Sequence, residues 1–337
     1  MISARRLWAV FVARNKEFLR DRGALAWNLM FPLFVVFGMA FAFNGRNQEV
    51  FKIGVLGEAS DLPPGFAATK YLKFVAFDDG EIAQARLRHH QIDLLVRPGR
   101  PLSYWVNETS PKGYLVERIL LGTDAASPPP VRAAVAGREI RYVDWLVSGL
   151  LGMNMMFSAL FGVGYAIVRY RKNGVLKRLK ATPLKAVEFL AAQIASRMVL
   201  IMAVFAIVYQ GSDLFLHYER LGSLVSLYLI FALGGACLVS LGLLVAASAT
   251  SEELAGGLLN LLSWPMMFLS GVWFSLEGAP RPLRLFAQAF PLTHMIDAAR
   301  SVMTEGATLA QVSGHLAVLA AMTAVFLAVG AWSFRWE

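Results

Sequence analysis

Few residues in this sequence have the types and spacing that catalysis, nucleotide binding or metal binding requires. A phosphate-binding P-loop needs a Gly-Lys pair, and none occurs in the 337 residues. The patterns HExxH, CxxC and GxSxG are also absent. His89 and His90 are neighbours that would point about 100° apart on a helix, which disfavours a shared metal ion. We therefore expect no catalytic residue, no metal and no cofactor bound by this chain alone.

Ionisable residues are also missing from the expected centres of the apolar runs. Transporters driven by protons or sodium keep such residues near the middle of the bilayer. Here Asp144, Glu188, Arg197 and Asp297 are expected near the ends of spans. The sequence thus indicates a transporter powered by another chain, or a passive pore, which the scarcity of polar residues along the spans disfavours.

The elements that carry these residues are those of a membrane protein. Apolar residue types make up 57% of the chain and charged types 16%, against about 25% charged in soluble domains. The apolar residues lie in runs of about twenty, which matches the hydrocarbon thickness of a bilayer. The net charge of +9 comes from basic residues beside these runs, which favours topology signals and anionic-lipid contacts over nucleic-acid binding. The single cysteine, Cys237, lies within an apolar run and is expected to be a small packing residue.

These runs predict an all-α polytopic membrane protein with six transmembrane helices and an inserted extracytoplasmic α+β domain between spans one and two. Residues 1–22 combine an apolar arc with basic residues, which favours a cytoplasmic amphipathic helix in the membrane surface over a basic tail. The first span is expected over 23–43 and the outer, periplasmic domain over 44–143. Residues 144–337 are expected to hold five transmembrane helices, a cytoplasmic coupling loop at 169–189 and short outer helices at 275–310.

Charges of both signs and short β-type runs distinguish the inserted domain from the spans. Strands are expected at 51–57, 74–77, 92–96 and 102–106, and helices at 81–90 and 113–121.

Local residue types predict two helix starts. Thr182 before Pro183 predicts the start of the third span, with threonine as cap and proline in the first turn. Ser251 before Glu252 and Glu253 predicts the start of the fifth span, because early carboxylates favour the positive end of a helix.

The distribution of basic residues sets the expected orientation. Six basic residues lie between Arg5 and Arg22 and seven between Arg169 and Lys185, whereas the turn between spans three and four offers only Arg220. Short cytoplasmic loops carry such an excess. Both termini are therefore expected in the cytoplasm of a multi-pass inner-membrane protein, and the large domain is expected on the outer side.

Two segments carry a family pattern. The first, Gly174-Val-Leu-Lys-Arg-Leu-Lys-Ala-Thr-Pro183, follows span two; the second runs from Ser270-Gly-Val-Trp-Phe to Pro291-Leu-Thr and Arg300. Together they resemble the type-2 permease family of ATP-binding-cassette (ABC) exporters, and the resemblance covers the full order of spans. The chain departs from that pattern at Arg171-Lys172-Asn173, where family members often carry an acidic residue.

The resemblance implies a separate cytoplasmic ATPase subunit that binds ATP and Mg, and a second permease in a homo- or heterodimer. The 174–181 segment would be a coupling helix inserted into a cleft of the ATPase. The alternative is a topology signal only, although the Leu176/Leu179 pair adds an apolar edge that topology does not require. The coupling residues so implied are Gly174, Leu176, Lys177, Arg178, Leu179, Lys180, Thr182 and Pro183.

The resemblance also implies that the second segment closes the outer end of a transport pathway. Prolines there would break the chain into short helices, which is tolerated where backbone groups are buried in protein or meet water. The residues of this outer gate are Ser270, Gly271, Phe274, Pro280, Pro291, Leu292, Thr293 and Arg300.

Glycines and methionines in spans two and five are candidates for a dimer seam and a substrate pathway. Small residues allow close helix approach, and the alternative is packing within one subunit; the glycines are Gly149, Gly152, Gly162, Gly164, Gly256, Gly257 and Gly271. A soft apolar wall for hydrophobic cargo, or a lipid-facing surface, is expected from Met153, Met156, Phe157, Met266, Met267 and Phe268.

These features favour the permease subunit of an ATP-driven exporter that moves a drug-like or lipid-like compound outward across the inner membrane. Export of a glycan or polymer is an alternative, which the outer domain disfavours because it would restrict a straight exit. A membrane anchor or sensor with a ligand-binding outer domain is another, although a sensor usually carries a cytoplasmic signalling domain. Besides the ATPase and the second permease, the expected partners are membrane lipids and a periplasmic adaptor, and not nucleic acid.

Overall fold

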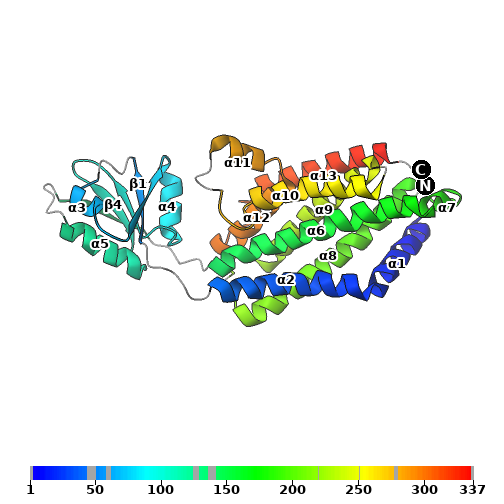
Figure 1. The fold of residues 1–337 in the computed structure, drawn as a ribbon, viewed down its shortest axis with the longest axis horizontal. Coiled ribbons are helices and arrows are strands. Elements are labelled where there is room, and N and C mark those ends of the chain that lie inside the picture. The colour runs from blue at the N-terminus through cyan, green and yellow to red at the C-terminus, as the bar shows by residue number, and fades with distance from the viewer. Residues whose placement is uncertain are drawn as a thin grey trace. The chain divides into compact units, whose positions relative to one another are not determined.

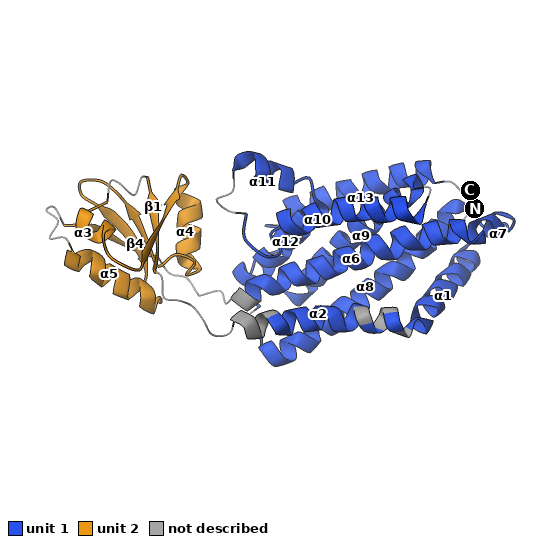
Figure 2. Cartoon of the chain, in the orientation of Figure 1, with its two compact units in different colours: residues 1–42, 143–337 blue, residues 43–142 orange. Residues whose placement is uncertain are grey.

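The computed structural model divides the chain into two compact units. It describes residues 3–43, 51–57, 62–123, 129–135, 142–218, 220–249, 251–276 and 280–334. Unit 1 combines Met1–Ala42 with Val143–Glu337, and unit 2 is Phe43–Tyr142 (Figure 2). The sequence-based range for the inserted domain is 44–143.

The described part of unit 1 consists of helices and their connections. Helix α1 begins and α13 ends at the same end of the unit as α7, and α11 lies toward the other end (Figure 1). The helices are α1 (Ala4–Arg20), α2 (Arg22–Phe43), α6 (Tyr142–Lys172), α7 (Val175–Lys180), α8 (Ala186–Leu216), α9 (Leu224–Ser248), α10 (Glu252–Leu269), α11 (Arg281–Ala287), α12 (Pro291–Glu305) and α13 (Ser313–Ser333).

Four helices among the described residues are long and apolar enough to cross a membrane. They are Asp144–Lys172 within α6, and α8, α9 and α13 over their full lengths. The other two predicted spans correspond to α2, which holds a shorter apolar stretch at Asn28–Gly38, and to α10, whose 18 residues extend about 27 Å. The structure thus supports a mostly helical membrane protein with four candidate spans, and the total of six stays a prediction.

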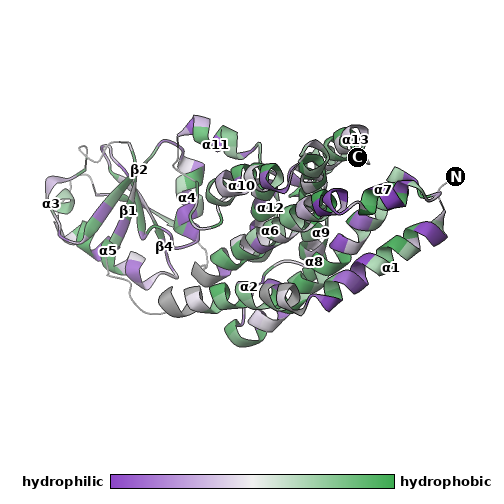
Figure 3. Cartoon of the chain, turned by 45° about the vertical axis from the view of Figure 1, so that its right-hand side comes forward, coloured by the Kyte–Doolittle hydropathy of each residue, from purple (hydrophilic) through white to green (hydrophobic). Residues whose placement is uncertain are grey.

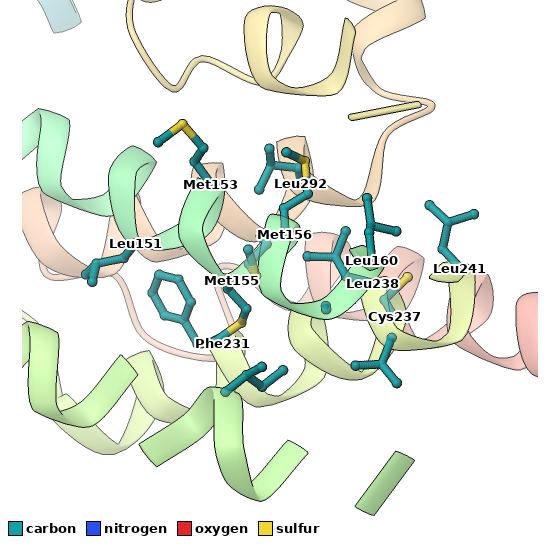
Figure 4. Packing of buried hydrophobic residues seen from close by; sticks show 14 of the residues in the cluster. Leu151, Met153, Met155, Met156, Leu160, Phe231, Cys237, Leu238, Leu241 and Leu292 are labelled. Atoms are coloured by element: carbon teal, nitrogen blue, oxygen red, sulfur yellow. The ribbon is translucent and has the colours of Figure 1, made fainter. Parts of the chain in front are cut away.

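Helix α9 forms the centre of unit 1. It packs against α8, α10, α12 and α13. In its most apolar stretch 72% of the residues are buried, whereas in α13 only 11% are. Met156 and Leu160 of α6 share one apolar cluster with Phe231 and Leu238 of α9 (Figure 4). Cys237 is fully buried in this cluster, which confirms its expected packing role. The outer side of α13 is left for lipid or another helix.

Helix α1 is amphipathic and packs along α8. Hydrophilic and hydrophobic residues alternate along it (Figure 3). Phe11 and Phe18 are half-buried, whereas Trp8 and Leu19 are 62% and 65% exposed. Large apolar side chains that remain outside a packed unit suit the surface of a membrane.

Helix α10 begins as predicted. The hydroxyl of Ser251 accepts a hydrogen bond from the main-chain N–H of Leu254 at 3.1 Å, so Ser251 is the helix cap.

Unit 2 is built on a five-stranded sheet in the order β2-β1-β3-β4-β5. Strand β1 pairs in parallel with β2 and β3, β3 pairs antiparallel with β4, and β4 pairs in parallel with β5. The elements are β1 (Phe51–Leu56), α3 (Pro64–Ala67), β2 (Leu72–Phe77), α4 (Gly80–Arg88), β3 (Leu94–Arg97), β4 (Ser103–Asn107), α5 (Pro111–Thr123) and β5 (Val131–Val135).

The four strands and two helices expected in unit 2 are confirmed with small shifts in their bounds, but the sequence does not reveal α3 or β5. Helix α3 is a single turn of four residues, which is too short for a periodic pattern. Strand β5 is mostly exposed and forms because β4 offers it a partner edge, since strand formation depends strongly on such context.

Several of the glycines expected at close helix approaches pack inside unit 1. A Cβ at Gly149 would lie 2.6 Å from the carbonyl oxygen of Val272, and one at Gly164 would lie 2.7 Å from Leu259 of α10. A Cβ at Gly257, by contrast, would meet open space. These contacts favour packing within one subunit for Gly149 and Gly164, and they leave Gly257 for a different neighbour.

We expect Gly149→Ala to lower the free energy of unfolding by about 1–3 kcal/mol, the usual cost of overpacking. The added methyl group would meet the main chain of Val272, which a side-chain rotation cannot relieve. Gly211→Ala in α8 is the matched control, because its Cβ enters open space and alanine favours a helix interior. The measurement is the thermal unfolding midpoint of the purified protein in detergent. Equal midpoints for both variants would contradict the close approach.

Candidate coupling and gating sites

Helix α7 is a short basic helix that is anchored on one side. Gly174 precedes it with a φ of 68°, a left-handed conformation that glycine adopts without strain, so the chain turns sharply after α6. Leu176 is fully buried and Leu179 packs against the apolar cluster of unit 1. Lys177, Arg178 and Lys180 are exposed. The apolar edge fixes α7 to unit 1, and the basic edge points outward.

The start of α8 differs from the prediction. The hydroxyl of Thr182 donates to the carbonyl of Leu179 at 2.6 Å, which closes the turn after α7 and does not cap α8. Pro183 is exposed ahead of the helix. The prediction is wrong because the Glu188 carboxylate accepts the main-chain N–H of Lys185 at 3.0 Å and so sets the helix start at that residue.

The Glu188 carboxylate accepts hydrogen bonds from the start of α1 and from the α7–α8 connection. Its Oε1 accepts the main-chain N–H of Ser3 at 2.6 Å and Nη2 of Arg6 at 2.9 Å, while its Oε2 accepts from Lys185. Arg6 also donates through Nη1 to the carbonyl of Pro183 at 2.6 Å. The Glu188 side chain is fully buried, and a buried carboxylate requires such partners. These five residues, the Glu188 cluster, join α1, the α7–α8 connection and α8.

A second set of contacts holds the end of α6 near α7. Arg14 of α1 donates to Glu17 at 2.9 Å and to the hydroxyl of Tyr170 at 3.0 Å, and that hydroxyl donates to Glu17. Arg171 donates to the carbonyl of Ala249, just after α9, at 2.6 Å. Helices α1, α6, α8 and α9 are therefore tied to one another by polar contacts at the α7 end of the unit.

The predicted gate residues gather around the turn that follows α10. The hydroxyl of Thr293 donates to the carbonyl of Ala287 at 2.7 Å and lies 2.9 Å from the hydroxyl of Ser270. Thr293 and Ser270 are both buried, as are Pro291 and Leu292. The first turn of α12 is thus fixed to the end of α10.

Arg300 links the same turn to α6. Its Nη2 donates to the carbonyl of Gly271 at 2.9 Å, and its guanidinium lies 3.9 Å from the centre of the Trp145 ring. Gly271 has a φ of 70°, which favours glycine. Phe274 is 52% exposed, and Pro280 is also exposed. The residues that come together, named here the gate cluster, are Ser270, Gly271, Pro291, Leu292, Thr293 and Arg300.

The predicted pathway residues do not share one surface in a single subunit. Met153, Met156, Met266 and Met267 are buried within unit 1. Phe157 is half-buried and Phe268 is 44% exposed. A role in substrate passage stays a prediction for all six. Among the described residues, no group of three or more His, Cys, Asp or Glu side chains is placed to hold a metal ion.

The expected position of Arg197 near a span end is wrong. It is the twelfth of the 31 residues of α8, and its Nε donates to the carbonyl of Ser158 at 2.8 Å. Ser158 is the middle residue of the 29-residue candidate span Asp144–Lys172. Both the residue and its guanidinium therefore lie well inside their helices, because the main chain of α6 offers a carbonyl that receives the charge.

Sequence reasoning missed the connection between α1 and α8. Glu188 is separated from Ser3 by 185 positions and from Arg6 by 182. The local signal was an acidic residue in the first turn of a helix, which indicates a cap. It does not reveal which distant donors that carboxylate also accepts.

Comparison with known proteins places the chain in a family. The profile of the ABC-2 family transporter protein matches residues 22–332, and the chain belongs to this family. The matched range runs from α2 to α13 and includes unit 2, α7 and the gate cluster. The family resemblance found in the sequence is confirmed.

Three similar proteins are two transport permeases and one nodulation protein. The inner membrane transport permease YhhJ of Escherichia coli (strain K12) is 26% identical over 188 residues, which are 54% of this chain and 49% of that protein. Nodulation protein J of Rhizobium leguminosarum bv. viciae is 36% identical over 90 residues, 27% of this chain and 34% of the relative. The linearmycin resistance permease protein LnrN of Bacillus subtilis (strain 168) is 24% identical over 186 residues, 55% of this chain and 48% of the relative. The chain spans about half the length, or less, of these relatives.

The family and the fold together define a class. The chain belongs to a family of ABC transporter permeases, which are membrane components of transporters. ABC-2 permeases work with a nucleotide-binding ATPase subunit. The apolar helices of unit 1 are consistent with an inner-membrane protein.

We expect Glu188→Ala to release the start of α1. The substitution leaves partly buried donors without an acceptor, at a cost of about 1 kcal/mol or more. A loss of one or two kcal/mol raises the open population roughly 5- to 30-fold, so trypsin should cut after Arg6 and Arg14 correspondingly faster. The measurement is limited trypsin digestion of the purified protein, followed by mass spectrometry of the N-terminal fragments.

Glu253→Ala is the control for this variant. Glu253 is an exposed carboxylate in the first turn of α10, so its removal should leave α1 in place. If both variants were cut at the wild-type rate, the Glu188 cluster would not be what holds α1.

Proposed function

We propose that this chain is the permease subunit of an ATP-driven exporter that moves a hydrophobic or amphipathic compound outward across the inner membrane. A separate cytoplasmic ATPase would supply the energy. The observation that carries the proposal is α7, a basic helix whose Leu176 is buried and whose flanks are joined to α1 and α8. Basic residues that only set the orientation of the spans would need positive charge but no such anchoring. The anchoring of α7 therefore favours a role in coupling ATP hydrolysis to transport.

The contacts of α7 provide a mechanical route for coupling. Lys177 and Arg178 point outward, where acidic residues of an ATPase cleft would attract them. A displacement of α7 would reach Arg6 through the carbonyl of Pro183, and would reach α8 through Lys185 and Glu188. Helix α6 would carry the displacement toward the gate cluster, because it contacts Arg14 near one end and Arg300 near the other.

An exposed apolar face on α10 favours pairing with a second permease. Leu254, Leu261, Trp264 and Phe268 are 46%, 69%, 52% and 44% exposed. They recur at spacings of seven, three and four, so they lie on one side of the helix together with Gly257. The small residue would allow close approach of the partner helix. This face is our candidate for the dimer seam.

The proposed direction and substrate class rest on charge and on one relative. The basic residues around α7 favour a cytoplasmic position for both termini, with unit 2 in the periplasm, where an adaptor could bind it. The relative named for linearmycin resistance favours outward movement of a harmful compound. A transport pathway beside this seam would be lined by apolar α10 side chains, which suits a hydrophobic or amphipathic cargo better than a polar polymer.

We expect the deletion of Val175–Lys180, or the triple charge reversal Lys177→Glu, Arg178→Glu and Lys180→Glu, to uncouple ATP hydrolysis from transport. Loss of charged contacts at an interface costs about 2–5 kcal/mol, so substrate-stimulated ATPase activity should fall by roughly tenfold or more. The measurement is ATP hydrolysis and transport by the permease reconstituted with its ATPase.

The matched control reverses two exposed charges on α11, with Arg281→Glu and Arg284→Glu. It should insert and couple as the wild type does. Transport at the wild-type rate by the α7 variants would refute the coupling role. A purified permease that retains no ATPase from its host would count against the whole proposal.

We expect α7 and unit 2 to lie on opposite sides of the membrane. Cys237 is the single cysteine and is fully buried, so a Cys237→Ala background is suited to labelling. In intact cells a membrane-impermeant maleimide should label Tyr114→Cys, which is 53% exposed in the native side chain, and should not label Lys177→Cys. Labelling of both positions from the same side would overturn the orientation.

A further inference from the structure

Arg197 is a charged side chain inside the helix bundle. It is 8% exposed, and both Nε, at 2.8 Å, and Nη2 donate to the carbonyl of Ser158 in α6. A Cβ at Gly162 would overlap the guanidinium. The glycine therefore allows the positive charge to lie directly against the main chain of α6.

Helix α1 brings a second positive charge to the same turn of α6. Arg14 donates through Nη2 to the carbonyl of Gly162 at 3.3 Å. The ring of Phe18, one turn further along α1, has its centre 5.9 Å from Cζ of Arg197. The residues Arg14, Phe18, Ser158, Gly162 and Arg197 form what we name the Arg197 site, where α1, α6 and α8 meet.

The positive charge of this site exceeds its negative charge. Glu17 forms an ion pair with Arg14 at 2.9 Å. Among the described residues, no carboxylate lies within ion-pair distance of Arg197. A carbonyl oxygen orients a guanidinium but does not neutralise it, and an unpaired charge away from water is costly. Charged residues at such depth in a membrane protein usually mark a functional site.

The guanidinium of Arg197 keeps one nitrogen available. Its Nη1 makes no hydrogen bond to the described chain, and it is not among the polar side-chain atoms that are fully buried without a partner. The side chain of Arg14 is 17% exposed. An anion that approaches between α1 and α6 could therefore accept from both arginines, and the planar guanidinium matches the oxygens of a phosphate.

We propose that the Arg197 site binds the phosphate of an anionic phospholipid. The lipid source is favoured because α1, which supplies Arg14 and Phe18 to the site, also exposes large apolar side chains, with Trp8 and Leu19 62% and 65% exposed. Acyl chains would cover these side chains while the phosphate meets the arginines. Basic sites between membrane helices bind such headgroups in general. The inference goes beyond the proposed export function and does not depend on it.

The test is native mass spectrometry of the purified full chain in detergent with equal amounts of phosphatidylglycerol and phosphatidylcholine. We expect the wild type to retain the anionic lipid roughly tenfold over the zwitterionic one, as a charge-assisted contact implies. Arg197→Gln keeps a hydrogen-bond donor but removes the charge, and it should abolish the preference. Arg14→Gln should weaken it. Arg220→Gln, an exposed arginine beyond α8, should leave it unchanged.

Inorganic phosphate provides the second arm of the test. At millimolar concentration it should not displace phosphatidylglycerol from the wild type, and displacement would overturn the lipid source. Equal retention of the two lipids by the wild type, or an unchanged preference in Arg14→Gln and Arg197→Gln, would overturn the site itself. If Arg197→Gln does not fold, Arg14→Gln decides alone, because Arg14 is partly exposed on α1 and its loss should still lower the preference.

Discussion

One buried carboxylate, that of Glu188, holds the α7 end of unit 1 together. Its two oxygens accept hydrogen bonds from Ser3 and Arg6 at the start of α1 and from Lys185 in the α7–α8 connection. A buried carboxylate that lost some of these donors would pay for its desolvation without compensation, so the contacts form together or not at all. Helix α1 has no fully buried residue of its own. Polar contacts, more than apolar packing, therefore fix its position and that of the α7–α8 connection.

The two ends of unit 1 are held by different chemistry. Ion pairs and charged hydrogen bonds join the helices near α7, whereas the gate cluster uses the hydroxyl of Thr293 and the contact of Arg300 with a carbonyl and a ring. Helix α6 contacts both ends, and its 31 residues extend about 46 Å. A helix of this length, packed against α9 in the apolar cluster, moves more readily as a whole than in parts. This property makes α6 the natural connection between the proposed coupling and gating regions.

Charge inside the bundle is rare and is placed where the main chain can receive it. Arg197 lies against the carbonyl of Ser158, and Gly162 leaves the space that its guanidinium occupies. A methyl group at that position would exclude the arginine. The carbonyl of Ser158 reduces the desolvation cost of the Arg197 charge, but only an anion would neutralise that charge. The proposed lipid phosphate would supply such an anion.

The sequence alone determined those helices, strands and caps that form through residues close to one another along the chain. Runs of apolar residues predicted α6, α8, α9 and α13, short β-type runs predicted four strands of unit 2, and Ser251 predicted the start of α10. Each of these signals acts over a few turns or less. The depth of the Arg197 charge and the distant partners of Glu188 were decided by the tertiary structure. They depend on main-chain groups at the start of α1 and in α6 that lie 39 to 185 positions away, and no local pattern specifies which distant donor or carbonyl a side chain will reach.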